Sequence, residues 1–306
     1  MLRRSLVLLA AALAGVLLLV PSTQGAAALA SDDFPVTVIA ANGKITVPRK
    51  PRRIVSLSPS ATESLFAIGA GRQVVAVDDQ SDYPSSAPRT RLSGFTPNAE
   101  AVAAYRPDLV IVAFDANTVV ASLKRLHIPV LLQPAPRTLL QAYEQIKQLG
   151  RATGHALAAR TLIARTRTRI ARLVAASTDR ARGVSFYHEL SPDYYSATSR
   201  TFIGTVYRLF GLRNIADAAE GSGSGYPKLA GEYVIAQDPR LVVLADTKCC
   251  GQTRATVAAR PGWDRIRAVR TGSIVLLDDS IASRWGPRVL NFVRAIASAL
   301  RTSVRS

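Results

Sequence analysis

The chain has 306 residues, 48% of them hydrophobic and 20% charged, and its formal net charge is +18. This composition excludes an intrinsically disordered chain, and the length is sufficient for two lobes. Nucleic-acid binding is disfavoured because zinc-finger spacing, an RNA-binding sheet motif and interleaved basic and aromatic residues are all missing. The positive charge favours an anionic cell envelope as the surroundings.

The N-terminus has the features of a secretory leader. Arg3 and Arg4 precede an uncharged apolar stretch over 6–20, and the segment Ala26-Ala27-Ala28-Leu29-Ala30 offers small-residue sites for cleavage, as in a signal peptide. The stretch is shorter than the roughly 20 residues of a membrane-spanning helix, so cleavage is favoured over an uncleaved anchor. We expect a signal peptide over 1–30 and export to the cell envelope or a periplasm-equivalent space, without a following cysteine to accept a lipid.

Strand and helix patterns alternate after the leader. Asn42-Gly43 predicts a hairpin over 36–47, and Ser60 with Glu63 predicts a capping box at the start of a helix. The expected strands of the first half are 54–57, 74–77, 109–114 and 130–132, and the expected helices are 60–68, 98–105 and 119–126. Apolar strands that alternate with helices predict a parallel sheet covered on both faces.

The middle of the chain predicts a long helix. From residue 138 to about 176 the apolar residues recur at helical spacing, without proline. Gly150 and Gly154 are the positions where this helix would bend or break. The alternation then resumes, with expected strands at 183–188, 241–245 and 274–277 and expected helices at 201–210 and 291–300.

The two halves contain an internal repeat. The segment 100–113 aligns with 232–245 at a constant offset of 132, with identical Glu, Val, Ala, Pro and Leu positions. Each copy reads as a helix, a proline stop and a strand, which predicts two lobes of one architecture. Glu100 and Glu232 would each begin a helix, where a carboxylate complements the helix dipole; docking to a two-fold symmetric partner is the competing hypothesis.

Candidate ligand contacts follow the ends of the predicted strands, because open α/β sheets bind ligands there. Their aromatic rings, arginine and scattered polar groups suit a large, flat, partly charged ligand. The candidates are Ser58, Asp79, Tyr83, Phe114, Tyr194, Tyr195, Lys248, Cys249, Cys250, Arg284 and Trp285.

Cys249 and Cys250 are the only cysteines. An even count in an oxidising compartment suggests pairing, but adjacent Cα atoms are about 3.8 Å apart, below the usual disulfide range. A bridge and two free thiols therefore remain equal alternatives. A secreted thiol or redox protein that uses this pair is the second functional hypothesis.

Catalytic and metal-binding motifs are otherwise missing. The glycine-serine run 221–225 lacks the spacing of a nucleophile elbow, and Walker and dinucleotide glycine motifs do not occur. Three separated histidines do not predict a metal cage. We expect no catalytic residue, no metal site and no enzyme activity.

Several ordered motifs resemble the cobalamin and iron-siderophore family of ABC substrate-binding proteins. They are the segment 51–63, Ser81-Asp82-Tyr83-Pro84, Glu100 with the segment 106–111, and Gly286-Pro287-Arg288. The resemblance runs from about residue 48 to 300 and is closest to the cobalamin-binding branch. The Lys248-to-Gly251 loop departs from that branch, which leaves cobalamin, ferric siderophore and haem as alternative ligands.

The resemblance implies a class III periplasmic-binding-protein fold, with two Rossmann-like α/β lobes joined by a single long helix. On this basis we expect an N-terminal lobe at 31–137, a connecting helix at 138–180 and a C-terminal lobe at 181–306. The resemblance also implies a transported ligand without a resident cofactor, and a contact of Arg284 with that ligand. Glu100 and Glu232 would dock onto an ABC permease dimer.

Overall fold

The computed structural model describes residues 33–302, all within one compact unit. The predicted signal peptide lies outside these residues. The described chain begins with a hairpin of β1 (Val36–Ala40) and β2 (Gly43–Val47), as predicted. The Asn42 side chain donates to the Val130 carbonyl at 2.9 Å and accepts from the Leu132 amide at 3.1 Å, so it ties the hairpin to the edge of the first sheet.

The N-terminal lobe contains a parallel four-stranded sheet in the order β4-β3-β5-β6. Its strands and helices are β3 (Ile54–Leu57), α1 (Pro59–Ala67), η1 (Ala70–Gln73), β4 (Val74–Val77), α2 (Ala99–Ala103), β5 (Leu109–Val112), η2 (Ala116–Thr118), α3 (Val119–Arg125) and β6 (Val130–Leu132). Ile54 packs into one apolar cluster and its neighbour Val55 into another. Because successive strand residues point to opposite faces, the sheet is covered on both sides, as predicted.

The C-terminal lobe repeats this topology in the order β8-β7-β9-β10, again parallel. Its elements are β7 (Ser185–Glu189), α7 (Phe202–Arg208), β8 (Arg213–Asn214), η3 (Ile215–Ala219), α8 (Gly231–Gln237), β9 (Leu241–Leu244), α9 (Arg254–Ala258), η4 (Trp263–Arg265), α10 (Arg267–Arg270), β10 (Ile274–Leu276), α11 (Asp279–Ser283) and α12 (Val289–Thr302). The strands of the second sheet follow one another in the same spatial order as those of the first, with β7 to β10 in the places of β3 to β6. The sequence repeat corresponds to α2–β5 and α8–β9, which confirms that the lobes share an architecture.

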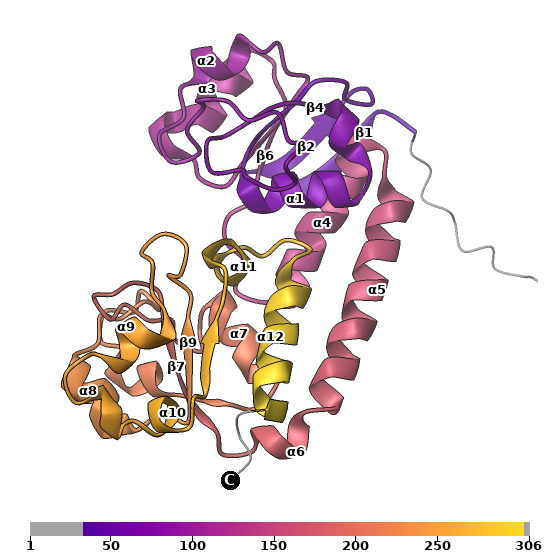
Figure 1. Ribbon diagram of the computed structural model, residues 1–306. Helices are drawn as coiled ribbons and strands as arrows, with labels where there is room; N and C mark the ends of the chain where they lie inside the picture. Colours follow the sequence, from indigo (N-terminus) through magenta and orange to yellow (C-terminus); the bar gives the residue numbers. More distant parts are fainter. Residues whose placement is uncertain (1–32, 303–306) are drawn as a thin grey trace, which may run out of the picture. The chain divides into compact units, whose positions relative to one another are not determined.

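The connecting segment is divided into α4 (Leu139–Thr153), α5 (Ala156–Ala175) and α6 (Thr178–Ala181). The long helix predicted from 138 is interrupted at Gly154, which adopts a left-handed φ of 72° and ends α4. The α4 and α5 helices then lie side by side (Figure 1). Gly150 permits this approach, since a Cβ there would collide with the Cβ of Ala159. The 20-residue α5 is the long connecting helix of the class III fold.

One predicted helix start differs from the structure. Pro59 begins α1 and Ser58 is its N-cap, with the Ser58 hydroxyl accepting from the Ala61 amide at 3.3 Å. The capping box predicted for Ser60 and Glu63 is therefore wrong. Proline is well suited to the first helical position because it has no amide hydrogen to satisfy, and Glu63 is left for contacts across the lobes.

Candidate functional site

Residues of both lobes line a cavity of about 350 Å³. The N-terminal lobe contributes loops that follow β3, β4 and β5, and the C-terminal lobe contributes α11 and the residues after it. These are carboxyl ends of parallel strands, where this class of sheet binds ligands. The lining residues are Ser58, Pro59, Ser60, Gln80, Phe95, Ala113, Phe114, Asp279, Ser280, Ser283, Arg284 and Trp285.

Aromatic rings and hydroxyl groups dominate this lining. Phe95 and Phe114 stack with ring centroids 5.9 Å apart, although they are 64% and 45% exposed. Trp285 adds an indole from the opposite lobe. The two phenylalanine rings therefore form an exposed apolar surface at the wall of the cavity.

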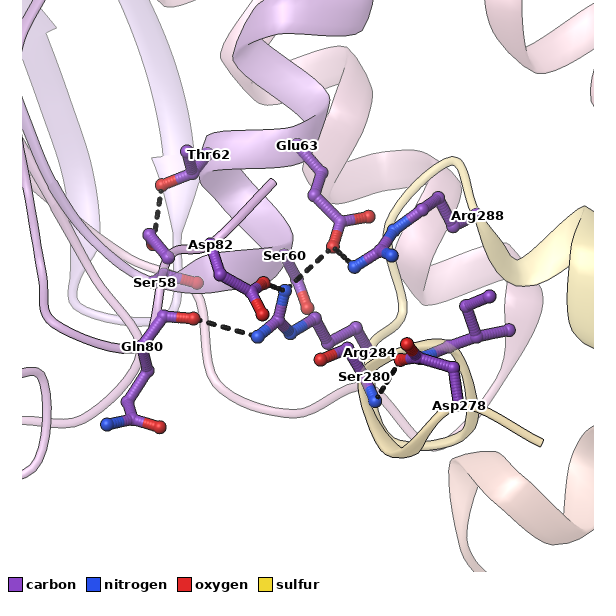
Figure 2. A network of polar contacts seen from close by, with 12 residues as sticks. Ser58, Ser60, Thr62, Glu63, Gln80, Asp82, Asp278, Ser280, Arg284 and Arg288 are labelled. Atoms are coloured by element: carbon purple, nitrogen blue, oxygen red, sulfur yellow. Dashed lines mark hydrogen bonds and ion pairs between the residues drawn. The ribbon is translucent and has the colours of Figure 1, made fainter. Parts of the chain in front are cut away.

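A network of charged side chains crosses from one lobe to the other beside the cavity (Figure 2). The Arg284 guanidinium donates to Asp82 Oδ1 at 2.6 Å, to Glu63 Oε1 at 3.2 Å and to the Gln80 carbonyl at 2.7 Å. Arg288 donates to the same Glu63 oxygen at 2.6 Å. Lys248 reaches Asp82 Oδ2 at 2.9 Å from a separate loop of the C-terminal lobe.

The position of Asp82 in this network affects its ionisation. Partial burial works to raise the pKa of Asp82, but hydrogen bonds from Lys248 and Arg284 outweigh it and lower the pKa to about 2. Asp82 is therefore a carboxylate at any physiological pH, and both inter-lobe ion pairs persist there.

The backbone around Gly286 brings the two lobes into contact. A Cβ at Gly286 would lie 3.1 Å from Glu63 Oε2 and 3.2 Å from the Ser60 carbonyl. The adjacent Trp285 amide donates to the Ser60 hydroxyl at 3.2 Å. A side chain at position 286 would therefore separate the C-terminal segment from α1 and disturb the buried Glu63.

The remaining candidates lie outside the cavity lining. Asp79 is exposed, and Tyr83 is 47% exposed beneath the Arg288 guanidinium, 4.3 Å from its ring centroid. Tyr194 points into the C-terminal lobe, where it stacks on Trp263 at 6.0 Å. Tyr195 is 44% exposed with Lys228 over its ring.

The Lys248 loop contains a disulfide between Cys249 and Cys250, so the bridged alternative is the one observed. Asp279 of α11 holds this loop by accepting from the Lys248 amide at 2.9 Å and the Cys249 amide at 2.7 Å. Both cysteines are exposed. The disulfide loop thus adjoins the cavity wall through Asp279 and positions Lys248 for its inter-lobe ion pair.

Two buried carboxyl groups face each other at the ends of β7 and β9. Glu189 is fully buried and receives two hydrogen bonds from Arg260, at 2.6 and 2.7 Å. Desolvation, with the nearby Glu189 charge, raises the pKa of Asp246 to about 7. His188 is also buried, which lowers its pKa to about 3. It is therefore a neutral core residue, hydrogen bonded to the Tyr207 hydroxyl at 2.6 Å.

Glu100 and Glu232 occupy equivalent places in the two lobes. Each lies in the first turn of its helix, α2 or α8, and each is exposed. Among residues 33–302 neither carboxylate forms an ion pair or a side-chain hydrogen bond.

Residues 54–281 match the periplasmic binding protein family. The chain belongs to this family. A protein of Halobacterium salinarum named cobalamin-binding protein is 33% identical over 300 residues, which is 95% of this chain and 80% of that protein. The haem-binding protein HutB of Vibrio cholerae superimposes with a TM-score of 0.72 at 25% identity, over 81% of this chain and 98% of its own. The vitamin B12-binding protein BtuF of Vibrio cholerae has the same fold, with a TM-score of 0.69, 23% identity, and coverage of 85% and 100%.

As a periplasmic binding protein the chain is exported, binds a small molecule and serves an ABC importer. The relatives are solute-binding proteins, in agreement with the predictions of no enzyme activity and no resident cofactor. Within the part of the chain that the structure covers, no helix has the length and apolar character of a membrane span. The same residues contain no group of three or more metal-ligating side chains.

Four predicted ligand contacts of this periplasmic binding protein line the cavity, namely Ser58, Phe114, Arg284 and Trp285. Gln80, Phe95, Ser280 and Ser283 line it as well and were not predicted. Gln80 and Ser280 directly follow the acidic pairs 78–79 and 278–279, which come after predicted strands. Their position in the sequence could therefore have identified them as candidates. Phe95 lies in a long loop with no periodicity, so its sequence context offered no such signal.

Proposed function

We propose that this periplasmic binding protein captures cobalamin or a related corrinoid between its lobes and delivers it to an ABC permease. The observation that carries the proposal is the cavity lining, in which Phe95, Phe114 and Trp285 supply flat apolar surface and serines supply hydrogen-bonding groups. A corrin ring with amide side chains needs both kinds of contact.

The lining favours a corrinoid over haem. Haem iron is held in proteins by His, Cys, Met or Tyr side chains. None of these residue types occurs among the twelve that line the cavity. The Halobacterium salinarum relative, named as a cobalamin-binding protein, supports the same choice.

The charge of the lining favours a corrinoid over an anionic ferric siderophore. Arg284 is the one cationic side chain among the lining residues, and Asp82, Glu63 and the Gln80 carbonyl already accept its hydrogen bonds. Asp279 is the one acid there, and two backbone amides donate to it. The two charged groups of the lining are thus paired within the protein, which suits a ligand of low net charge.

Ligand entry requires the lobes to separate. A volume of about 350 Å³ is at the small end of the range for sites that hold drug-sized ligands, and a corrinoid is larger. Opening would break the contacts of Asp82 with Arg284 and Lys248, which lie at the edge of the cavity. These ion pairs therefore stabilise the arrangement of the lobes described here, and a corrinoid would have to displace them in order to enter.

Delivery would use Glu100 and Glu232. Both are exposed, both lack a partner in the described chain, and the internal repeat gives them one position in each lobe. A dimeric permease with a basic group on each subunit would meet one glutamate per lobe.

Truncation of the aromatic pair tests the ligand site. Phe114→Ala should weaken cyanocobalamin binding about tenfold, because it removes one ring face and the stacking that orients Phe95. Tyr226→Ala is the matched control, since Tyr226 has nearly the same exposure, 44%, but lines a different cavity. Equal affinities of the Phe114 variant and the unsubstituted protein, measured by calorimetry, would exclude this cavity as the corrinoid site.

A further inference from the structure

The connecting helices carry much of the positive charge of the molecule. Residues 138–182 contain nine basic and two acidic residues, an excess of seven in a chain whose formal net charge is +18. Five of the basic residues are arginines of α5, which has no acidic residue.

The α5 arginines border the outward face of the helix on both sides. Arg160 and Arg167 line a groove of about 230 Å³ shared with α4, and Arg165 lines a groove of about 530 Å³ beside α1. Arg169 and Arg172 continue the Arg165 edge, at helical spacings of four and seven residues. Between the two edges runs an exposed, uncharged stripe of Leu157, Ala164, Thr168, Ala171 and Ala175.

These arginines are not engaged within the described chain. None of the five forms an ion pair or a side-chain hydrogen bond there. Glu144, the only acid lining either groove, pairs with Lys147 at 2.8 Å. Leu157 and Leu140 protrude beside the arginines with 61% and 69% exposure.

We propose that this arginine-bordered face of α5 binds the surface of an anionic phospholipid bilayer. Guanidinium groups pair bidentately with phosphates, and each basic residue near an anionic surface adds favourable binding energy. The two protruding leucines decide the class of partner, because apolar side chains enter the headgroup boundary of a bilayer. A soluble polyanion would gain nothing from them.

This binding would leave the docking glutamates accessible. Figure 1 shows α5 on one side of the molecule and the helices of Glu100 and Glu232, α2 and α8, on the other. Contact of α5 with lipid would retain the protein near the membrane while its cavity remains open to ligand.

Vesicle sedimentation tests the proposal, with the compact unit from residue 32 onward in every sample. Vesicles of phosphatidylcholine that contain phosphatidylglycerol at a mole fraction of ~0.3 have a strongly negative surface and should bind the protein. Vesicles of phosphatidylcholine alone should not bind it. The triple variant Arg165→Gln, Arg169→Gln and Arg172→Gln should lower partitioning roughly tenfold or more. Its cyanocobalamin affinity and circular dichroism should be unchanged.

Two controls separate lipid binding from general positive charge. Replacing the exposed Arg49, Arg91 and Arg270 with Gln removes the same charge elsewhere and should change partitioning about threefold at most. Leu140→Ser with Leu157→Ser should weaken vesicle binding but not retention on heparin. The proposal is overturned if anionic vesicles do not bind, if both arginine sets reduce binding equally, or if the leucine variant binds vesicles normally.

Discussion

Asp246 is a buried carboxyl group without a compensating hydrogen bond in the part of the chain that the structure describes. It is fully buried, and neither carboxylate oxygen has a hydrogen-bond donor among the described residues. Desolvation raises its pKa to about 7, and the Glu189 charge adds to the effect. An ionised Asp246 would place a second negative charge beside Glu189, whose own charge is compensated by Arg260.

The raised pKa predicts a pH dependence of stability that Asp246 should cause. The pKa of about 7 means that the folded protein keeps the Asp246 proton up to about pH 7, whereas the unfolded chain releases it near 3.8, the ordinary value for an aspartate. The free energy of unfolding should therefore decrease as pH rises from about 4 to about 7 because of this group. Asp246→Asn cannot ionise, so at pH 7.5 it should be more stable than the unsubstituted protein by up to about 4 kcal/mol.

Urea unfolding of both proteins at pH 4.5, 6.0 and 7.5 measures this difference. Contributions of His188 and of Asp78, whose burial raises its pKa to about 6, are present in both proteins and cancel in the subtraction. Asp193→Asn, which changes an exposed acid, should show no such trend. A difference that stays constant across the three pH values would refute this role of Asp246.

The duplicated helix and strand are the elements with the clearest functional consequence. α2 with β5 and α8 with β9 place Glu100 and Glu232 at equivalent positions. Glu100→Lys combined with Glu232→Lys should leave cyanocobalamin affinity unchanged, since neither residue lines the cavity. Uptake of labelled cobalamin by cells that depend on this binding protein should decrease at least about tenfold, because both docking contacts become repulsive.

Asp33→Lys with Asp264→Lys is the matched control, since both acids are exposed and lie outside the cavity lining. It adds the same positive charge and should transport normally. Uptake equal to that of the unsubstituted protein in the glutamate variant would refute docking through these residues.

The elements that sequence patterns predicted well are those with a strong local signal. The apolar strand segments 54–57 and 241–245 and the helix that begins at Asn98 were recognised because each pattern is complete within a few neighbouring residues. The sequence did not decide whether the helix ends at Gly154, because the apolar spacing of α4 and α5 continues across this residue. The packing of Gly150 on Ala159 is a tertiary contact that the periodicity does not report.

At the scale of the whole molecule, the two lobes produce a cavity that neither could form alone. Topology predicts which loops meet there, because the carboxyl ends of parallel strands lie at one edge of each sheet. It does not predict which side chain of a loop faces the ligand. Tyr194 and Tyr195 illustrate this, since one packs into the C-terminal lobe on Trp263 and the other projects to the surface.

The inter-lobe ion pairs could not be predicted from local sequence patterns, because their partners are far apart in the chain. Glu63 and Arg288 are 225 residues apart in the sequence, and Asp82 and Arg284 are 202 apart. Arg284 was predicted as a ligand contact and does line the cavity, but its described partners are two carboxylates and a backbone carbonyl of the other lobe. Arg284 therefore both lines the cavity and forms ion pairs between the lobes.

Calorimetric titration of the compact unit with cyanocobalamin tests the central proposal most directly, beside haem and a ferric siderophore under the same conditions. Saturable binding of cyanocobalamin with a dissociation constant below about 1 µM, or about −8 kcal/mol, is the predicted result, with the other two ligands at least tenfold weaker (about 1.4 kcal/mol). Tight binding of haem or the iron complex without cyanocobalamin binding would contradict the corrinoid assignment and retain the importer. No binding of any of the three would contradict the assignment of this cavity to all of these ligands.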